Sequence, residues 1–313
     1  MLKQTTNTLL LIRPLGFRKN EQTELNNYYQ QDLPNVSAEN ITNNALNEFD
    51  ALVEKIKSKG IQVLVVDSIA SDDTPDAVFP NNWVSFHQDG TLGIYPMFAE
   101  NRRRERREEI IEHVEAQGFG IEDVIDYSSA EEEGYFLEGT GSVVLDRVHK
   151  KAYCSLSARS DEDLFIEFCE DFEYTPVLFT ANQTVHGERK AIYHTNVLLS
   201  VGENFAVICL ESIDDKKERK QVLQHLKQDG KELIVVTEAQ VASFAANILQ
   251  VSGMEGKKHI IMSESARQIY RKDQIEKLEK HGEIVSSELK TIETCGGGSM
   301  RCMIAEVFLP KRS

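Results

Sequence analysis

One order of hydrophobic patterns recurs along the chain: a helical segment, an apolar strand and a hairpin. In the first unit, apolar residues keep a helical spacing through 40–60, and Gly60 marks a helix end. The apolar stretch IQVLVVDSI (61–69) predicts a strand. The stretch FPNNWVSFHQDGTLGIYPM (79–97) then predicts a hairpin that turns at the Asp-Gly pair 89–90.

The same order returns in 103–156, 161–212, 216–264 and 266–310. The segment TLLLIRP (8–14) has no helix before it, so we expect it to complete the last unit and close a ring. The predicted fold class is therefore α/β: a closed five-bladed α/β propeller with pseudo-fivefold ββαβ repeats around a central channel. We expect residues 1–313 to form a single domain, without an interdomain linker.

The start of each hairpin carries a polar residue at intervals of 53 to 56 residues: Asn82, Glu138, His194, Asn247 and Cys302. In a closed ring, equivalent positions face one channel, so these side chains should converge. An acid, a base and a thiol in one pocket are typical of covalent nucleophilic catalysis. The glycines of GGGSMRC would let a flat substrate group lie against the backbone. Cys295 lies outside the repeat register, and Asn247 reads as a structural cap.

Composition narrows the classes of partner. The chain has 35 Lys plus Arg against 51 Asp plus Glu, a formal charge of -16, which disfavours nucleic-acid binding. The arginine run NRRRERREE (101–109) is interrupted by acids and predicts a solvated helix face. The apolar run LLLI (9–12) is too short for a signal segment or a membrane span. Five cysteines, an odd number, fit a reducing cytoplasm, and no His/Cys spacing suggests a metal.

Four motifs in this order, FPNNW, FLEGTG, YHTN and GGGSMRC, carry a family resemblance over nearly the whole chain. The sequence resembles the guanidino-group-modifying (amidinotransferase/arginine deiminase) superfamily with the pentein fold, and within it the citrulline hydrolase-like branch. The resemblance implies that Cys302 is the nucleophile, His194 the acid/base and Glu138 the carboxylate that orients the substrate. It implies substrate-binding roles for the motif residues Phe79, Asn82 and Asn196, and for Arg159 in SLSARSD, where deiminases bind the substrate carboxylate. One arginine of 102–107 is an alternative for that last role.

Two positions depart from the deiminase pattern. Asn82 and Asn196 stand where arginine deiminases usually carry aspartates, which leaves Glu138 alone among the expected paired acids. A guanidinium is permanently charged and asks for carboxylates, whereas asparagine can both donate to and accept from a neutral ureido group. The expected reaction is hydrolysis of citrulline to ornithine, ammonia and carbon dioxide, without a cofactor.

Several alternatives stay open at this point. An arginine deiminase or an amidinotransferase would use the same residues, and a substituted arginine could also meet asparagines. A non-catalytic propeller that binds a partner by its surface is the alternative of another class. The expected partner is a small amino acid, with no nucleic acid or membrane partner and with a homo-oligomer possible.

Overall fold

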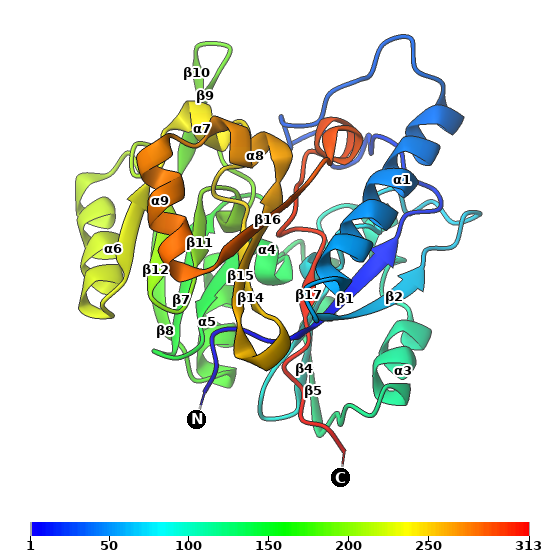
Figure 1. Ribbon diagram of the computed structural model, residues 1–313, viewed down its shortest axis with the longest axis horizontal. Helices are drawn as coiled ribbons and strands as arrows, with labels where there is room; N and C mark the ends of the chain where they lie inside the picture. The colour runs from blue at the N-terminus through cyan, green and yellow to red at the C-terminus, as the bar shows by residue number, and fades with distance from the viewer. Residues whose placement is uncertain (1, 313) are drawn as a thin grey trace.

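The computed structural model describes residues 2–312 and contains five three-stranded sheets of the same design (Figure 1). In each sheet an antiparallel pair is extended by a parallel third strand. The sheets are β3(Val84–Phe86)-β4(Thr91–Ile94)-β5(Asp123–Asp126), β6(Val143–Asp146)-β7(Lys151–Leu156)-β8(Thr175–Thr180), β11(Leu199–Val201)-β12(Phe205–Ile208)-β13(Glu232–Val235), β14(Leu249–Ser252)-β15(Lys258–Ser263)-β16(Glu283–Ser287) and β17(Ala305–Glu306)-β1(Thr8–Arg13)-β2(Gln62–Asp67).

A helix precedes the parallel third strand of every sheet, because two parallel neighbours cannot be joined by a tight turn and need a crossover. These helices are α1(Ala38–Lys57), α3(Glu108–Ala116), α5(Glu162–Asp171), α6(Lys216–Gln228) and α9(Lys272–His281). In Figure 1 they lie on the outside of the molecule, with the strands between them. The predicted order of hairpin, helix and strand is thus confirmed in four units, whereas in the fifth sheet the antiparallel pair joins β17 with β1 from the other end of the chain.

Helix α1 shows why the spacing of apolar residues predicted the helices correctly. Ser37 caps its first turn by accepting a hydrogen bond from the Asn40 amide. One face is buried at helical spacing, including Phe49 at 1% exposure and Ile56 at 0%. Full burial of such a side chain stabilises the fold by roughly 1.5–3 kcal/mol, so this face fixes the helix against β2 and β16.

The N-terminal strand completes the last sheet, as predicted. Strand β1 pairs antiparallel with β17, with Leu9 opposite Glu306, and parallel with β2, with Leu9 opposite Val63. The two ends of the chain therefore share one sheet, and both termini lie on the same side of the molecule (Figure 1).

Two segments differ from the expectation. The run 101–109 is not a solvated helix face: it holds the short helix α2(Glu100–Arg103), and Arg102 is only 1% exposed because its guanidinium has buried acceptors. A hairpin of β9(Asn182–Val185) and β10(Glu188–Ala191) was not predicted, since its exposed β10 has no apolar pattern. It projects at the end of the molecule opposite the termini (Figure 1).

The remaining elements are short. They are the helices α4(Gly139–Ser142), α7(Glu238–Val241) and α8(Glu264–Ile269), 3-10 turns at Pro80–Asn82, Ser128–Glu132, Thr195–Val197 and Met254–Gly256, and a π-helical turn at Ile292–Gly296. Within residues 2–312, none of the helices combines the length and apolarity that a membrane span requires.

Candidate active site

Short helical turns stand directly before the first strand of several sheets and position the predicted residues. Asn82 ends the turn before β3, Glu138 precedes α4 before β6, and His194 precedes the turn before β11. Cys302 lies in the corresponding turn before β17. Asn82, His194 and Cys302 line one small cavity, and the Glu138 carboxylate bonds to His194, so the repeat register brings all four together.

The thiol of Cys302 is buried, with 3% of the residue exposed. The Asn247 side-chain amide donates toward its Sγ at 3.2 Å, and the Asn196 amide lies 3.5 Å from the same sulfur. Burial raises the pKa of the thiol, although these amides, a Ser299 backbone contact and the charge of Arg301 oppose that rise. The resting sulfur is therefore protonated at neutral pH and meets two donors suited to a thiolate.

Asn247 has the predicted capping role and one more. Its amide donates to the Asn196 carbonyl at 3.0 Å, and its side-chain oxygen accepts from the Arg301 backbone amide at 2.9 Å. These partners fix which end of the side chain is the amide. The contact with the Cys302 sulfur was not predicted, because a capping asparagine gives no sequence signal for it.

Glu138 and His194 form a buried pair, with 2.7 Å between carboxylate oxygen and Nε2. Burial alone would raise the pKa of Glu138, but Arg159, the His194 hydrogen bond and Arg102 together lower it well below its usual range. Burial, aided by the charges of Arg159 and Arg102, lowers the pKa of His194 to about 4 in spite of Glu138. A carboxylate can only accept, so Nε2 carries the proton and Nδ1 keeps a free lone pair.

Asn82 bonds to Arg102, an arginine that the sequence analysis expected on a solvated helix face. Its side-chain oxygen accepts from Arg102 at 2.7 Å, and its amide donates to Asn81 at 3.1 Å. A guanidinium can only donate, so the carbonyl end of Asn82 must face Arg102. Arg102 is held in turn by Glu105, whose carboxylate accepts two hydrogen bonds at 2.9 Å. The Asn82 amide has a second N–H, which remains available to a ligand.

Glu138 is not the lone acid of the site, as the motifs had suggested. Asp76 is 2% exposed and lines the same cavity as Cys302. Asn20 and Thr23 donate to one of its carboxylate oxygens, and the other oxygen is buried without a partner. Asp76 lies six residues before Asn82, outside every motif, so only the folded chain reveals it.

Residues 20–31, here named the strap, contribute Asn27 to the lining of the cavity and bond to Arg159, the predicted carboxylate ligand. The Asn26 side-chain oxygen accepts from Arg159 Nε at 2.8 Å and from Nη2 at 2.5 Å. Arg159 also donates to the Thr23 carbonyl at 3.0 Å and lies 3.4 Å from Glu138. The structure thus brings Arg159 to the site, where its guanidinium is engaged by the strap.

The glycines before Cys302 admit the flat ring of Phe79. A Cβ built on Gly296 would lie 2.8 Å from the Phe79 ring, and one on Gly298 would lie 3.0 Å from it. Gly296 and Gly298 also line the cavity beside Cys302, so a substrate group against these glycines stays a prediction. Gly141 has a related role, because its Cβ would lie 2.4 Å from the Asn82 amide and 2.8 Å from His194 Nδ1.

The cavity has a volume of about 10 Å³, which is space for roughly one water molecule. Cys295 is not one of its lining residues and is buried in the core within the π-helical turn. An amino acid can enter only if residues around the cavity move. The strap is one of the segments that contact the glycine turn, with Asn27 and Gln30 donating to the Gly296 carbonyl, while Tyr193 donates to the Gly297 carbonyl.

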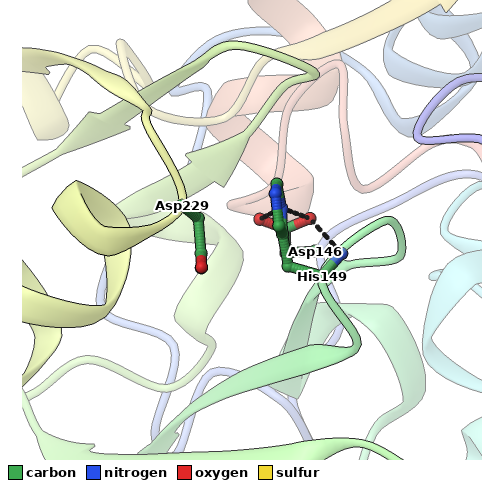
Figure 2. A group of neighbouring side chains, drawn as sticks. All are labelled: Asp146, His149 and Asp229. Atoms are coloured by element: carbon green, nitrogen blue, oxygen red, sulfur yellow. Dashed lines mark hydrogen bonds and ion pairs between the residues drawn. The ribbon is translucent and has the colours of Figure 1, made fainter.

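One group with metal-ligand residue types lies elsewhere in residues 2–312. Figure 2 shows Asp146 and His149, from the β6–β7 turn, beside Asp229, from the end of α6. Lys231 lies 2.8 Å from the Asp146 carboxylate, and Lys151 lies 2.7 Å from that of Asp229. Two ammonium groups already neutralise the charges of the two carboxylates, so this group has no unpaired negative charge that favours a metal cation.

Comparisons with known proteins agree on the fold. The profile of the family described as N,N dimethylarginine dimethylhydrolase, eukaryotic, matches residues 13–309. No curated protein matches the chain. ArgZ, an arginine dihydrolase from the ornithine-ammonia cycle in cyanobacteria, superposes over 97% of this chain with a TM-score of 0.73 and 18% identity. The chain spans 41% of that protein.

Two further structures match over their whole length. The isolated N-terminal domain of ArgZ, bound to substrate, gives a TM-score of 0.70 at 17% identity and covers 96% of this chain and 99% of its own. A dimethylarginine dimethylaminohydrolase variant, in an adduct with S-methyl-L-thiocitrulline, gives 0.63 at 15% identity and covers 98% of this chain and 100% of its own. At such identities the likeness establishes the α/β fold.

Proposed function

Because the chain belongs to the N,N-dimethylarginine dimethylhydrolase family of guanidino-group-modifying enzymes, we propose that it hydrolyses the ureido group of citrulline through a covalent adduct on Cys302. The net reaction consumes one water and yields ornithine, ammonia and carbon dioxide. The orientation of Asn82, with its carbonyl tied to Arg102 and one amide N–H left for a ligand, carries the choice of a ureido substrate.

In the first half-reaction, His194 Nδ1 takes the proton of the Cys302 thiol as the sulfur attacks the ureido carbon. The side-chain amides around the sulfur and at Asn82 stabilise the developing negative charge. The protonated His194 then gives its proton to the departing δ-amine, the C–N bond breaks, and ornithine leaves an S-carbamoyl cysteine. Glu138 holds His194 in the required tautomer.

In the second half-reaction, His194 accepts a proton from water, and the hydroxide attacks the carbamoyl carbon. The C–S bond breaks, and the proton returns from His194 to the sulfur. The carbamic acid that is released falls apart to ammonia and carbon dioxide. Every proton that His194 accepts is passed on within the same half-reaction, which suits an imidazole that rests neutral, with its pKa lowered to about 4.

Asp76 supports arginine as a second candidate substrate. Its unpartnered buried oxygen in the cavity can accept from N–H groups of a guanidinium or from an α-ammonium. On arginine the same thiol chemistry yields citrulline and ammonia, and citrulline is then the substrate of the reaction above. Transfer to a second amine in place of water would make the protein an amidinotransferase, and the same residues would serve it.

Substrate entry requires this cavity of about 10 Å³ to widen, and we propose that the strap moves to admit the amino acid. We infer that the substrate carboxylate takes the place of the Asn26 oxygen on Arg159, since a carboxylate is the stronger acceptor for a guanidinium fork. The strap would then close over the bound amino acid.

We also propose that the five sheets form the blades of one closed propeller around the site. Contacts between neighbouring units support this arrangement: β3 lies beside β17, β6 beside β11, and β11 beside β14. Hydrogen bonds link the inner turns in the same way, from Asn196 to the Thr140 carbonyl and from Asn247 to the Asn196 carbonyl.

An assay of ornithine, ammonia and citrulline after incubation with citrulline, arginine or N,N-dimethylarginine tests the proposed function. We expect ornithine and ammonia from citrulline, and loss of turnover in Cys302→Ala without unfolding, since the change removes one small atom from a cavity rim. Product from arginine or dimethylarginine alone would overturn the choice of substrate. No product from any of the three would favour a non-catalytic binding protein.

A further inference from the structure

Arg147 differs from the other buried arginines of residues 2–312. Arg102, Arg159 and Arg301 are each at most 8% exposed, and their guanidinium nitrogens lie 2.9, 3.4 and 3.0 Å from a glutamate oxygen. Arg147 is 6% exposed, and no carboxylate of the described residues lies within 4.0 Å of its guanidinium. Burying a charge away from a counter-charge is costly, so the Arg147 guanidinium favours an anionic partner.

Two acids around Arg147, its chain neighbour Asp146 and Glu306, already have cationic partners. The Asp146 carboxylate lies 2.8 Å from Lys231 and also accepts from His149, while the Glu306 carboxylate pairs with Arg301 at 3.0 Å. The Arg147 guanidinium instead lies over the Phe308 ring, 4.0 Å from its centroid. An aromatic face attracts a cation without accepting all of its N–H hydrogen bonds, and the Tyr174 side chain also contacts the guanidinium, so further donors of the five remain for a ligand.

Arg147 lines a cavity of about 280 Å³ that shares none of the residues lining the Cys302 cavity. Lys3 and Lys150 line it too, and Phe172 and Tyr174 form an aromatic wall. Lys150 donates one hydrogen bond, to the Phe172 carbonyl at 3.0 Å, and retains further donors.

The charges of this cavity leave an excess of one cation. Lys3, Arg147 and Lys150 face two exposed carboxylates at the rim, Asp89 and Glu173, so three positive charges oppose two negative ones. His87 adds no charge, because burial and the charges of Arg147 and Lys150 lower its pKa well below the usual range. A protein of net charge -16 thus keeps a positive cavity.

We propose that this cavity is a binding site for a small oxyanion, a carboxylate or a phosphate, with Arg147 as its main ligand and Lys150 as the second. The Arg147 fork would donate to two oxygens of the anion, and any apolar part would lie against Phe172 and Tyr174. This anion site does not overlap the proposed catalytic site, so the proposal does not depend on citrulline being the substrate.

Thermal unfolding and titration calorimetry of the full chain in sodium phosphate and in sodium acetate test this site, with sodium chloride at equal ionic strength as reference. We expect Tm to rise with one of the two anions, and the rise to saturate. In Arg147→Met we expect the rise to vanish and the affinity to fall at least tenfold. Without the anion, this variant should be as stable as the wild type, because methionine keeps the apolar stem and removes the unpaired charge.

Two further variants complete the test. Arg267→Met makes the same substitution at an exposed arginine of α8 and should keep the full response. Lys150→Met should weaken the anion affinity severalfold. If Arg147→Met does not fold, the affinity of Lys150→Met tests the site in its place. A response to neither phosphate nor acetate would overturn the site, as would an equal response in Arg147→Met.

Discussion

Replacing Asn82 with aspartate tests how the proposed site chooses between citrulline and arginine. The Asn82 oxygen accepts from Arg102 at 2.7 Å, and an aspartate can keep that contact through one oxygen. The second oxygen then replaces the amide. A ureido carbonyl would face an acceptor instead of a donor and lose a hydrogen bond worth about 1 kcal/mol net. A guanidinium would gain a charge-assisted acceptor worth about 1 kcal/mol or more.

The two effects act in the same direction on the ratio of kcat/KM for arginine over citrulline. Their sum of about 2 kcal/mol corresponds to roughly a thirtyfold shift toward arginine. The assay measures kcat/KM for both substrates in wild type, Asn82→Asp and Asn43→Asp. The last variant makes the same chemical change at an exposed asparagine of α1 that does not line the cavity, so its ratio should stay near wild type. A folded and active Asn82→Asp enzyme with an unchanged ratio would refute the role of Asn82.

Three other predictions concern the acid/base pair and the strap. Glu138→Ala and His194→Ala should each lower kcat strongly. The double variant should be little worse than His194→Ala, because both residues act on one intermediate. If steady-state kinetics show that the two losses multiply, the residues act independently. The folded pKa of His194, about 4, lies below its usual 6.5, so the free energy of unfolding should fall by about 3 kcal/mol as the pH drops from 6.5 to 4. His194→Gln should flatten that slope in urea unfolding, and an unchanged slope would place the titration elsewhere. Asn26→Ala should lower KM by roughly tenfold, because the substrate no longer displaces an internal acceptor from Arg159, whereas an unchanged or raised KM would contradict that exchange.

The repeat explains why much of this fold could be predicted. Period-2 and period-3.6 patterns mark each hairpin and helix, and a shared register along the repeat points Asn82, His194 and Cys302 toward one place. The pairing of β1 with β17 followed from a strand without a helix of its own.

What could not be predicted comes from contacts that carry no periodic signal. Asn26 and Asp76 reach the site from segments outside the repeat motifs, and their roles depend on the path of the strap. Arg102 sits in a run of charges that is typical of a solvated surface, and only its partners Asn82 and Glu105 explain its burial. The glycines before Cys302 signalled a close approach, but not that Phe79 makes it.

The covalent step is the central claim, and mass spectrometry of the enzyme quenched in acid during citrulline turnover tests it most directly. We expect one added carbamoyl group, located on the peptide that carries Cys302 and absent from Cys302→Ala. His194→Ala should slow both its formation and its release. Turnover of citrulline without an adduct, or with the carbamoyl group on Cys295, would contradict the mechanism proposed for this site.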